Sequence, residues 1–234
     1  MFFKKKNKVI ESIYEKVVSI SRKEKFYTHL KVPDTFDGRF DMLILITILV
    51  VYKLNLIKPQ GHLLSQKLFD TLFKDLDYSL RELGAGDVGV ISRIKEMSSA
   101  YLGRQKAYCE LFKSNNLEGL ITSLNNNVYR NVDVDHQKVK LLALFCFETI
   151  KKLNNYQEHE VLEGNFDFPS LQLWILLLHC LILTDKNHKS FIVTCKLRGL
   201  FLEKIKISLD AMGGDNAPQI VVEGASEAKI RNPG

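Results

Sequence analysis

At 234 residues the chain is long enough for one large domain, or for an ordinary domain with extensions. Hydrophobic residues make up 46% and charged residues 26%, with only 5 prolines and 13 glycines, which excludes collagen-like and low-complexity chains. The net charge of +6 arises between Met1 and Lys31, where nine basic residues stand against three glutamates. This segment suits an anionic membrane surface, or simply a solvated helix start, and both readings stay open. No basic stripe continues further along the chain, so we expect no nucleic-acid partner.

The four cysteines are scattered and form no CxxC pair, which indicates reduced and mostly buried thiols in the cytosol. They are Cys109, Cys146, Cys180 and Cys195. The basic start passes directly into "VIESIYEKVV", where charges interrupt any apolar signal region. We therefore expect a cytoplasmic protein that can lie peripherally on the inner membrane.

The first predicted element is an amphipathic helix over residues 7–23, because its apolar residues follow one helical stripe. The stretch "VPDTFDGRFD" then has loop composition, and Asp34 or Asp37 is the predicted N-cap of the next helix. That helix spans Phe40 to Leu56 and contains the apolar run "MLILITILVVY". The run has eleven residues, fewer than the roughly 18–20 that cross a bilayer, so we expect a buried core helix.

Further helical periodicity predicts an all-α helical bundle up to about residue 170. The predicted helices are Leu63–Leu83, Ile91–Asn115, Leu117–Tyr129 and Gln137–Asn155. Between the first two of these, "GAGDVGV" predicts a tight corner in which glycines adopt positive φ, with Asp87 as a cap of the following helix. The loop "NVDVDHQ" likewise predicts a helix cap rather than a metal site.

Beyond Ser170 the pattern changes. Residues 171–203 form an irregular apolar junction, whose run "LQLWILLLHCLIL" is shorter than a membrane span but leaves open a membrane-anchored interaction protein. Residues 204–234 then predict a strand, a paired-glycine turn and a helix start, a short fragment of α/β type. We place domain boundaries near residues 170 and 202.

Charged residues concentrate at two places. "PDTFDGRFD" brings together Asp34, Asp37, Arg39 and Asp41, and the region around the glycine corner contains Asp77, Arg81 and Asp87. Paired carboxylates can bind a cation or transfer protons, but a calcium loop needs more oxygen ligands and a closing glutamate. The spacing favours ion-paired organisers of the loops. No nucleophile motif or zinc pattern occurs, so we expect no catalytic residue, no metal and no cofactor.

Two long blocks resemble the ubiquinol–cytochrome c chaperone family closely. They are "FYTHLKVPDTFDGRFDMLIL" and "LFDTLFKDLDYSLRELGAGDVGVISRIKEMSSAYLGRQKAY", and "NNVYRN" and "GNFDFPS" are similar to later parts of bacterial members. The resemblance covers about residues 9–170. It implies a non-enzymatic factor that helps to assemble the respiratory ubiquinol–cytochrome c reductase at a bacterial inner membrane, with cytochrome b or another reductase subunit as its client. We expect the client-binding or fold-organising residues within the blocks to be Tyr27, Asp34, Asp37, Arg39, Asp41, Asp77, Arg81 and Asp87.

Residues 204–234 resemble a second family. "ISLDAMGGDNAPQIVVEGA" is similar to the amino-terminal strand and glycine turn of PlsX-type phosphate acyltransferases, which transfer an acyl group from acyl-carrier protein to phosphate. This resemblance suggests acyl transfer as an alternative function. A single strand and helix cannot cover both faces of a sheet, however, so we expect a truncated fragment without that activity. We interpret residues 204–234 as a gene-fusion or gene-model remnant.

Overall fold

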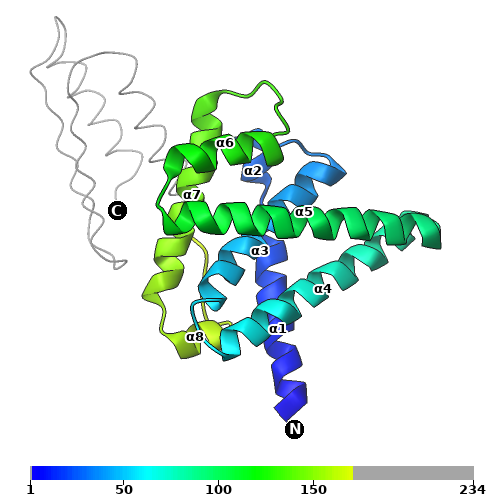
Figure 1. Ribbon diagram of the computed structural model, residues 1–234, viewed down its shortest axis with the longest axis vertical. Coiled ribbons are helices and arrows are strands. Elements are labelled where there is room, and N and C mark those ends of the chain that lie inside the picture. The colour runs from blue at the N-terminus through cyan, green and yellow to red at the C-terminus, as the bar shows by residue number, and fades with distance from the viewer. Residues whose placement is uncertain (1, 171–234) are drawn as a thin grey trace, which may run out of the picture. The chain divides into compact units, whose positions relative to one another are not determined.

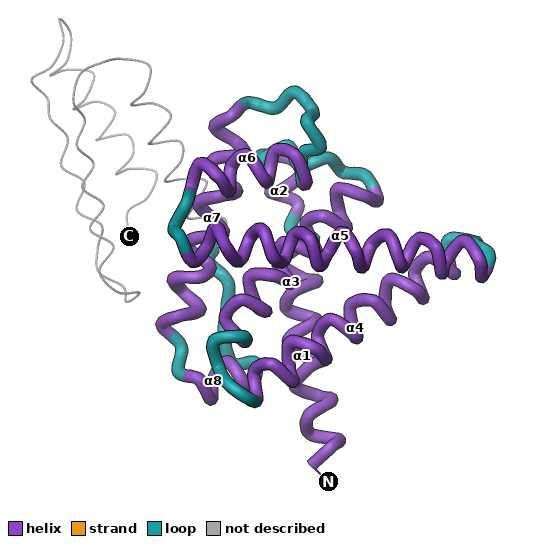
Figure 2. The backbone as a smooth tube through the Cα atoms, in the orientation of Figure 1, coloured by secondary structure: helices purple, strands orange, loops and turns teal. Residues whose placement is uncertain are grey.

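The computed structural model describes residues 2–170, with side chains from residue 8 onward. Within residues 2–170 every regular element is a helix and none is a strand, which confirms the predicted all-α architecture for this part (Figure 2). The predicted junction at residues 171–203 and the predicted fragment at 204–234 lie outside the described residues. The helices are α1 (Phe2–Ser21), α2 (Glu24–Thr28), α3 (Phe36–Leu54), α4 (Gln60–Glu82), α5 (Asp87–Lys113), α6 (Leu117–Asn127), α7 (His136–Asn155) and α8 (Glu158–Leu162).

The central element is α3, which packs against α1, α4, α5 and α7 (Figure 1). Its apolar residues occupy all sides, and nearly every side chain from Phe40 to Leu54 is buried. A helix that is apolar all round is stable in water only when other helices cover it, so the prediction of a buried core helix is confirmed. Among the helices of residues 2–170, none combines the length and the apolar character needed to cross a bilayer.

The amphipathic helix α1 confirms the first predicted element and begins earlier, at Phe2. Its stripe, which includes Ile13 and Val17, is buried, and α1 contacts α3 and α4. On its other side, the Lys16 ammonium donates hydrogen bonds of 2.8 Å to the carbonyls of Gly164 and Phe166. These bonds fasten the extended segment after α8 to the first helix of the chain.

The start of α3 differs from the prediction. Thr35, rather than Asp34 or Asp37, is the N-cap, and its hydroxyl accepts a hydrogen bond from the Gly38 amide at 3.1 Å. Gly38 is required because a Cβ at this position would lie 2.0 Å from the Pro33 carbonyl oxygen. Asp34 and Asp37 do not cap α3 and instead bind Arg39 and Arg93.

The corner between α4 and α5 confirms one of the glycine predictions. Gly84 has a φ of +87°, and the amides of Gly84 and Ala85 donate to the carbonyls of Arg81 and Leu80, which forms a Schellman cap. Gly86, which has a negative φ, is the N-cap of α5, and Asp87 is the first residue of that helix. The prediction that Asp87 caps α5 is therefore wrong. From this corner α4 and α5 separate toward the body of the bundle (Figure 1).

Two short helices, α2 and α8, were not predicted, because five residues are too few to show helical periodicity. The loop before α7 does contain the predicted cap, since the Asp135 carboxylate accepts a hydrogen bond from the Gln137 amide at 3.0 Å. Of the cysteines, Cys146 is buried and Cys109 is partly exposed, both as free thiols.

Candidate functional site

The predicted charged residues fall into three groups, and the first lies in the loop before α3. Two guanidinium nitrogens of Arg39 donate to the two carboxylate oxygens of Asp34, and the guanidinium lies 5.3 Å from the centre of the Tyr27 ring. The Asp34 hydrogen bond raises the pKa of Arg39. The Tyr27 hydroxyl donates to the Ser21 carbonyl at 2.8 Å. The structure thus contains an Arg39–Asp34 ion pair, and its role as an organiser of the loop stays a prediction.

The second group joins α3 to the helices beside it. Asp41 is buried and accepts hydrogen bonds from Arg104 of α5 and, at 2.9 Å, from Arg130 in the α6–α7 loop. One turn earlier, Asp37 binds Arg93 of α5 at 2.8 Å and Arg130 at 3.3 Å. We call these five residues the aspartate network. Arg130 contacts both carboxylates, so a single side chain links the network.

Burial has the largest effect on the pKa of Asp41 within the aspartate network. It raises the pKa of Asp41, and the hydrogen bonds and charges of Arg130 and Arg104 oppose that rise. Conversely, the hydrogen bond from Asp41 raises the pKa of Arg130. Removing one partner of such a pair leaves an uncompensated buried charge, at a cost of about 3–5 kcal/mol. The network therefore commits α3, α5 and the α6–α7 loop to one arrangement.

The α6–α7 loop is strained where it supplies Arg130. Arg130 and Asn131 have φ values of +53° and +58°, in the left-handed region that costs a non-glycine residue about 1 kcal/mol or more. The preceding residue, Tyr129, is fully buried, and its hydroxyl donates to the Leu30 carbonyl at 3.0 Å. This anchor and the two ion pairs of Arg130 hold the strained backbone in place.

The third group lies at the corner between α4 and α5. The Arg81 guanidinium donates to Asp77 at 2.7 Å and also to Asp87, which joins the end of α4 to the start of α5. These hydrogen bonds raise the pKa of Arg81. The side chain of Asp87 is 82% exposed, so this ion pair is open to solvent and gives little stability.

Beside this exposed ion pair, four large apolar side chains face solvent. Their exposed fractions are 62% for Tyr78, 71% for Leu83, 84% for Val88 and 65% for Ile91. We call these four residues the hairpin-tip patch. Single exposed apolar residues are common on protein surfaces, whereas several that lie near charged residues form a candidate interaction surface.

Comparison with protein families gives a match over residues 28–212 to the model described as "Ubiquinol-cytochrome C chaperone". The chain belongs to the ubiquinol–cytochrome c chaperone family. A solved structure, the crystal structure of the Cbp3 homolog from Brucella abortus, is 28% identical to this chain, with a TM-score of 0.66. The alignment covers 72% of this chain and 93% of that structure. Comparison with curated proteins gave no match.

The chaperone-family match includes seven of the eight predicted site residues, and Tyr27 directly precedes it. The match also continues past residue 170, over the whole predicted junction and into the first residues of the acyltransferase-like stretch. Within residues 2–170, no group of three His, Cys, Asp or Glu side chains is arranged to hold a metal ion.

Sequence reasoning did not name Arg93, Arg104 and Arg130 as site residues. A signal for them existed, because an aspartate next to the largely apolar run "MLILITILVV" is a candidate for burial, and a buried carboxylate needs a cationic partner. It also missed the hairpin-tip patch, because apolar residues at helical spacing ordinarily indicate a core. The arrangement thus separates a charged group around the buried Asp41 from an exposed apolar group at the α4–α5 corner.

Proposed function

We propose that this protein is a non-enzymatic chaperone that holds cytochrome b while the ubiquinol–cytochrome c reductase is assembled. The family supports a role in assembly of that complex. The observation that supports holding an apolar client is the hairpin-tip patch. Its four side chains expose apolar surface to water, which is unfavourable unless a partner covers them. A subunit with transmembrane helices exposes large apolar surfaces before assembly and supplies such a cover.

The surroundings of the patch fit this proposal. Asp77 and Asp87 each pair with Arg81 on the same α4–α5 corner as the apolar residues, so both signs of charge lie beside the patch. Such a rim favours one orientation of a client and discourages indiscriminate apolar association. Because the tip residues form few buried contacts, they can adapt to a client without loss of the core.

Deletion of the gene tests the function. We expect loss of ubiquinol–cytochrome c reductase activity and a strong fall in the amount of cytochrome b in the membrane, with restoration by the wild-type gene. Unchanged cytochrome b and an unchanged reductase complex would refute the proposed function.

A matched pair of double variants tests the surface. Leu83→Ser with Val88→Ser removes two apolar side chains from the hairpin-tip patch, and Leu56→Ser with Val132→Ser removes the same residue types elsewhere, where they are 53% and 52% exposed. We expect only the tip variant to fail in restoring reductase assembly, although both accumulate as folded proteins. If both variants restored reductase assembly equally, the client would have to bind a surface other than the hairpin tip.

We also propose that the start of α1 contacts the anionic inner-membrane surface, where the client is inserted. Lys4, Lys5, Lys6 and Lys8 lie in the first two turns of α1, and the start of this helix extends past the other helices (Figure 1). Each cation near such a surface contributes about 1 kcal/mol. The protein should sediment with vesicles that contain phosphatidylglycerol but not with pure phosphatidylcholine vesicles, and Lys4→Gln with Lys5→Gln and Lys6→Gln should weaken that binding. Binding that ignores lipid charge would contradict this part of the proposal.

A further inference from the structure

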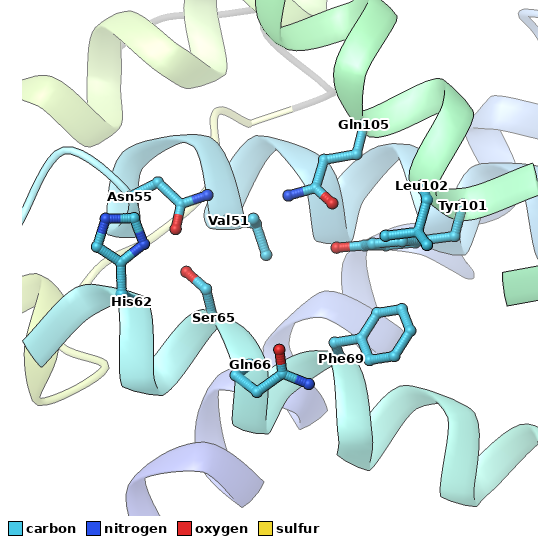
Figure 3. A pocket seen from close by; sticks show the side chains of 9 residues that line it. All are labelled: Val51, Asn55, His62, Ser65, Gln66, Phe69, Tyr101, Leu102 and Gln105. Carbon is cyan, nitrogen blue, oxygen red and sulfur yellow. The ribbon is translucent and has the colours of Figure 1, made fainter. Parts of the chain in front are cut away.

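A cavity of about 190 Å³ lies between α3, α4 and α5, where the two arms of the α4–α5 hairpin separate (Figure 3). Its deep side is formed by Val51, Ser65 and Tyr101, which are 1%, 8% and 1% exposed. Its rim carries the side-chain amides of Asn55, Gln66 and Gln105. The cavity is separate from the hairpin tip, since Ser65 and Leu83 are eighteen positions apart on α4, roughly 27 Å along a helix.

The deep side of the cavity contains hydrogen-bonding capacity that the described residues do not use. The Ser65 hydroxyl oxygen is buried and has no hydrogen-bond partner among residues 8–170. Figure 3 shows the Ser65 hydroxyl and the Tyr101 hydroxyl both directed into the cavity. Buried polar groups in folded proteins nearly always have partners, so the unpartnered Ser65 hydroxyl marks the place where a ligand's polar group would lie.

The size and charge of the cavity limit its ligand. An apolar cavity of about 150 Å³ holds benzene, so this cavity has room for a benzene ring with one small substituent. Sites for complete small-molecule ligands are larger, about 300–1,000 Å³. The residues that line the cavity include no lysine, arginine, aspartate or glutamate, and His62 lies at its exposed rim. An ionised group at the buried Ser65 end would therefore lose its hydration without gaining an opposite charge. An uncharged ring with a hydroxyl satisfies all three limits.

The aromatic and apolar side chains in the walls of the cavity also favour an aromatic ring. The Phe69 ring lines the cavity and meets Tyr101 edge to face, with ring centres 5.1 Å apart, and Leu102 forms part of the rim. A phenol ring between Phe69 and Leu102 would bring its hydroxyl to Ser65 and Tyr101. The rim amides of Asn55 and Gln105 would then face the peptide groups on either side of the ring, whereas the Gln66 amide already donates to the Asp70 carboxylate at 2.9 Å. Amides both donate and accept, as peptide groups require.

We infer that this cavity is an anchor pocket for one tyrosine side chain of the polypeptide that the chaperone holds. The identity of that polypeptide rests on the proposed function, whereas the chemistry of the pocket does not. A buried aromatic anchor in a small pocket is the usual source of affinity in a protein interface, and tyrosine is among the residues that serve most often. The pocket supplies specificity for a side chain, and the hairpin-tip patch supplies general apolar contact.

The test uses p-cresol, which is the side chain of tyrosine, and toluene, which is that of phenylalanine. Titration of the isotope-labelled full-length protein, followed by amide chemical shifts in NMR, should show p-cresol shifting residues 51–55, 62–69 and 101–105. Toluene should bind at least tenfold more weakly, because it cannot form a hydrogen bond with the buried Ser65 hydroxyl. N-acetyltyrosinamide should bind more tightly than p-cresol, because its peptide groups reach the rim.

Three variants make the result decisive. Ser65→Leu fills the cavity and should abolish the shifts, and Ser65→Ala keeps the shape and should reduce the preference for p-cresol over toluene. Ser99→Ala makes the same change on the exposed surface of α5 and should leave binding unchanged. Shifts scattered over the protein, shifts that persist in Ser65→Leu, or toluene binding as tightly as p-cresol would overturn the anchor pocket. None of these outcomes would affect the gene-deletion test, so the pocket and the proposed function fail independently.

Discussion

The aspartate network and the α4–α5 corner contain the same chemical groups, aspartate paired with arginine, but in opposite surroundings. The Asp41 side chain is 1% exposed and lies between two arginines from other parts of the chain. The Asp87 side chain is 82% exposed and pairs with Arg81, six residues earlier. Because the first group is buried, disturbing it costs much free energy of unfolding. Because the second group is exposed, disturbing it costs little. We therefore infer that the fold depends on the network, whereas the tip can bind a client without loss of stability.

Replacement of Asp41 should produce the largest effect. In Asp41→Ala the Arg104 guanidinium, whose side chain is 15% exposed, loses its carboxylate, so we expect a loss of about 3–5 kcal/mol in the free energy of unfolding. Urea denaturation followed by circular dichroism measures this loss. Asp87→Ala is the matched control and should leave the urea midpoint unchanged. Equal midpoints for Asp41→Ala and the wild type would show that the network does not organise the fold.

One substitution made in both regions should give the second largest difference. A Cβ at Gly38 would lie 2.0 Å from the Pro33 carbonyl oxygen, whereas a Cβ at Gly86 meets nothing within 4 Å. We expect Gly38→Ala to cost about 1–3 kcal/mol through backbone displacement, and Gly86→Ala to change stability by less than about 0.5 kcal/mol. Thermal melting of both variants measures the contrast. A destabilised Gly86→Ala protein would indicate that the tip is packed more tightly than the structure shows.

Replacement of Arg81 should have the smallest effect on the fold. Its partners Asp77 and Asp87 lie beside it on the α4–α5 corner, and all three charges are solvated. Arg81→Met should therefore melt at the wild-type temperature in low and in high salt. A clear fall in melting temperature would place Arg81 with the fold-organising residues instead.

Long runs of helical periodicity were sufficient to predict the helices of residues 2–170. The apolar run of α3 and the stripe of α1 each predict an element, and the structure contains both. The caps were harder, because Asp34 and Asp37 are good capping residues that bind Arg39 and Arg93 instead. Arg93 lies 56 residues from Asp37, a distance over which sequence spacing carries no information.

The exposed apolar residues of the tip also could not be recognised from sequence spacing. Val88 and Ile91 have the spacing of a core stripe, and only the arrangement of the helices shows that nothing among the described residues covers them. Likewise, the cavity beside Ser65 depends on the angle at which α4 and α5 separate, which periodicity does not encode. Local pattern predicted the helices, but the binding surfaces come from how they are placed together.

A crosslinking experiment tests the central claim, that the exposed tip binds the client, most directly. A photoreactive amino acid is placed at Val88 in the hairpin-tip patch or at Val132 in the α6–α7 loop, which is also exposed. After irradiation during cytochrome b synthesis, we expect a crosslink to cytochrome b from position 88 and none from position 132. A crosslink from position 132 alone, or none from position 88, would contradict the assignment of the tip as the client surface.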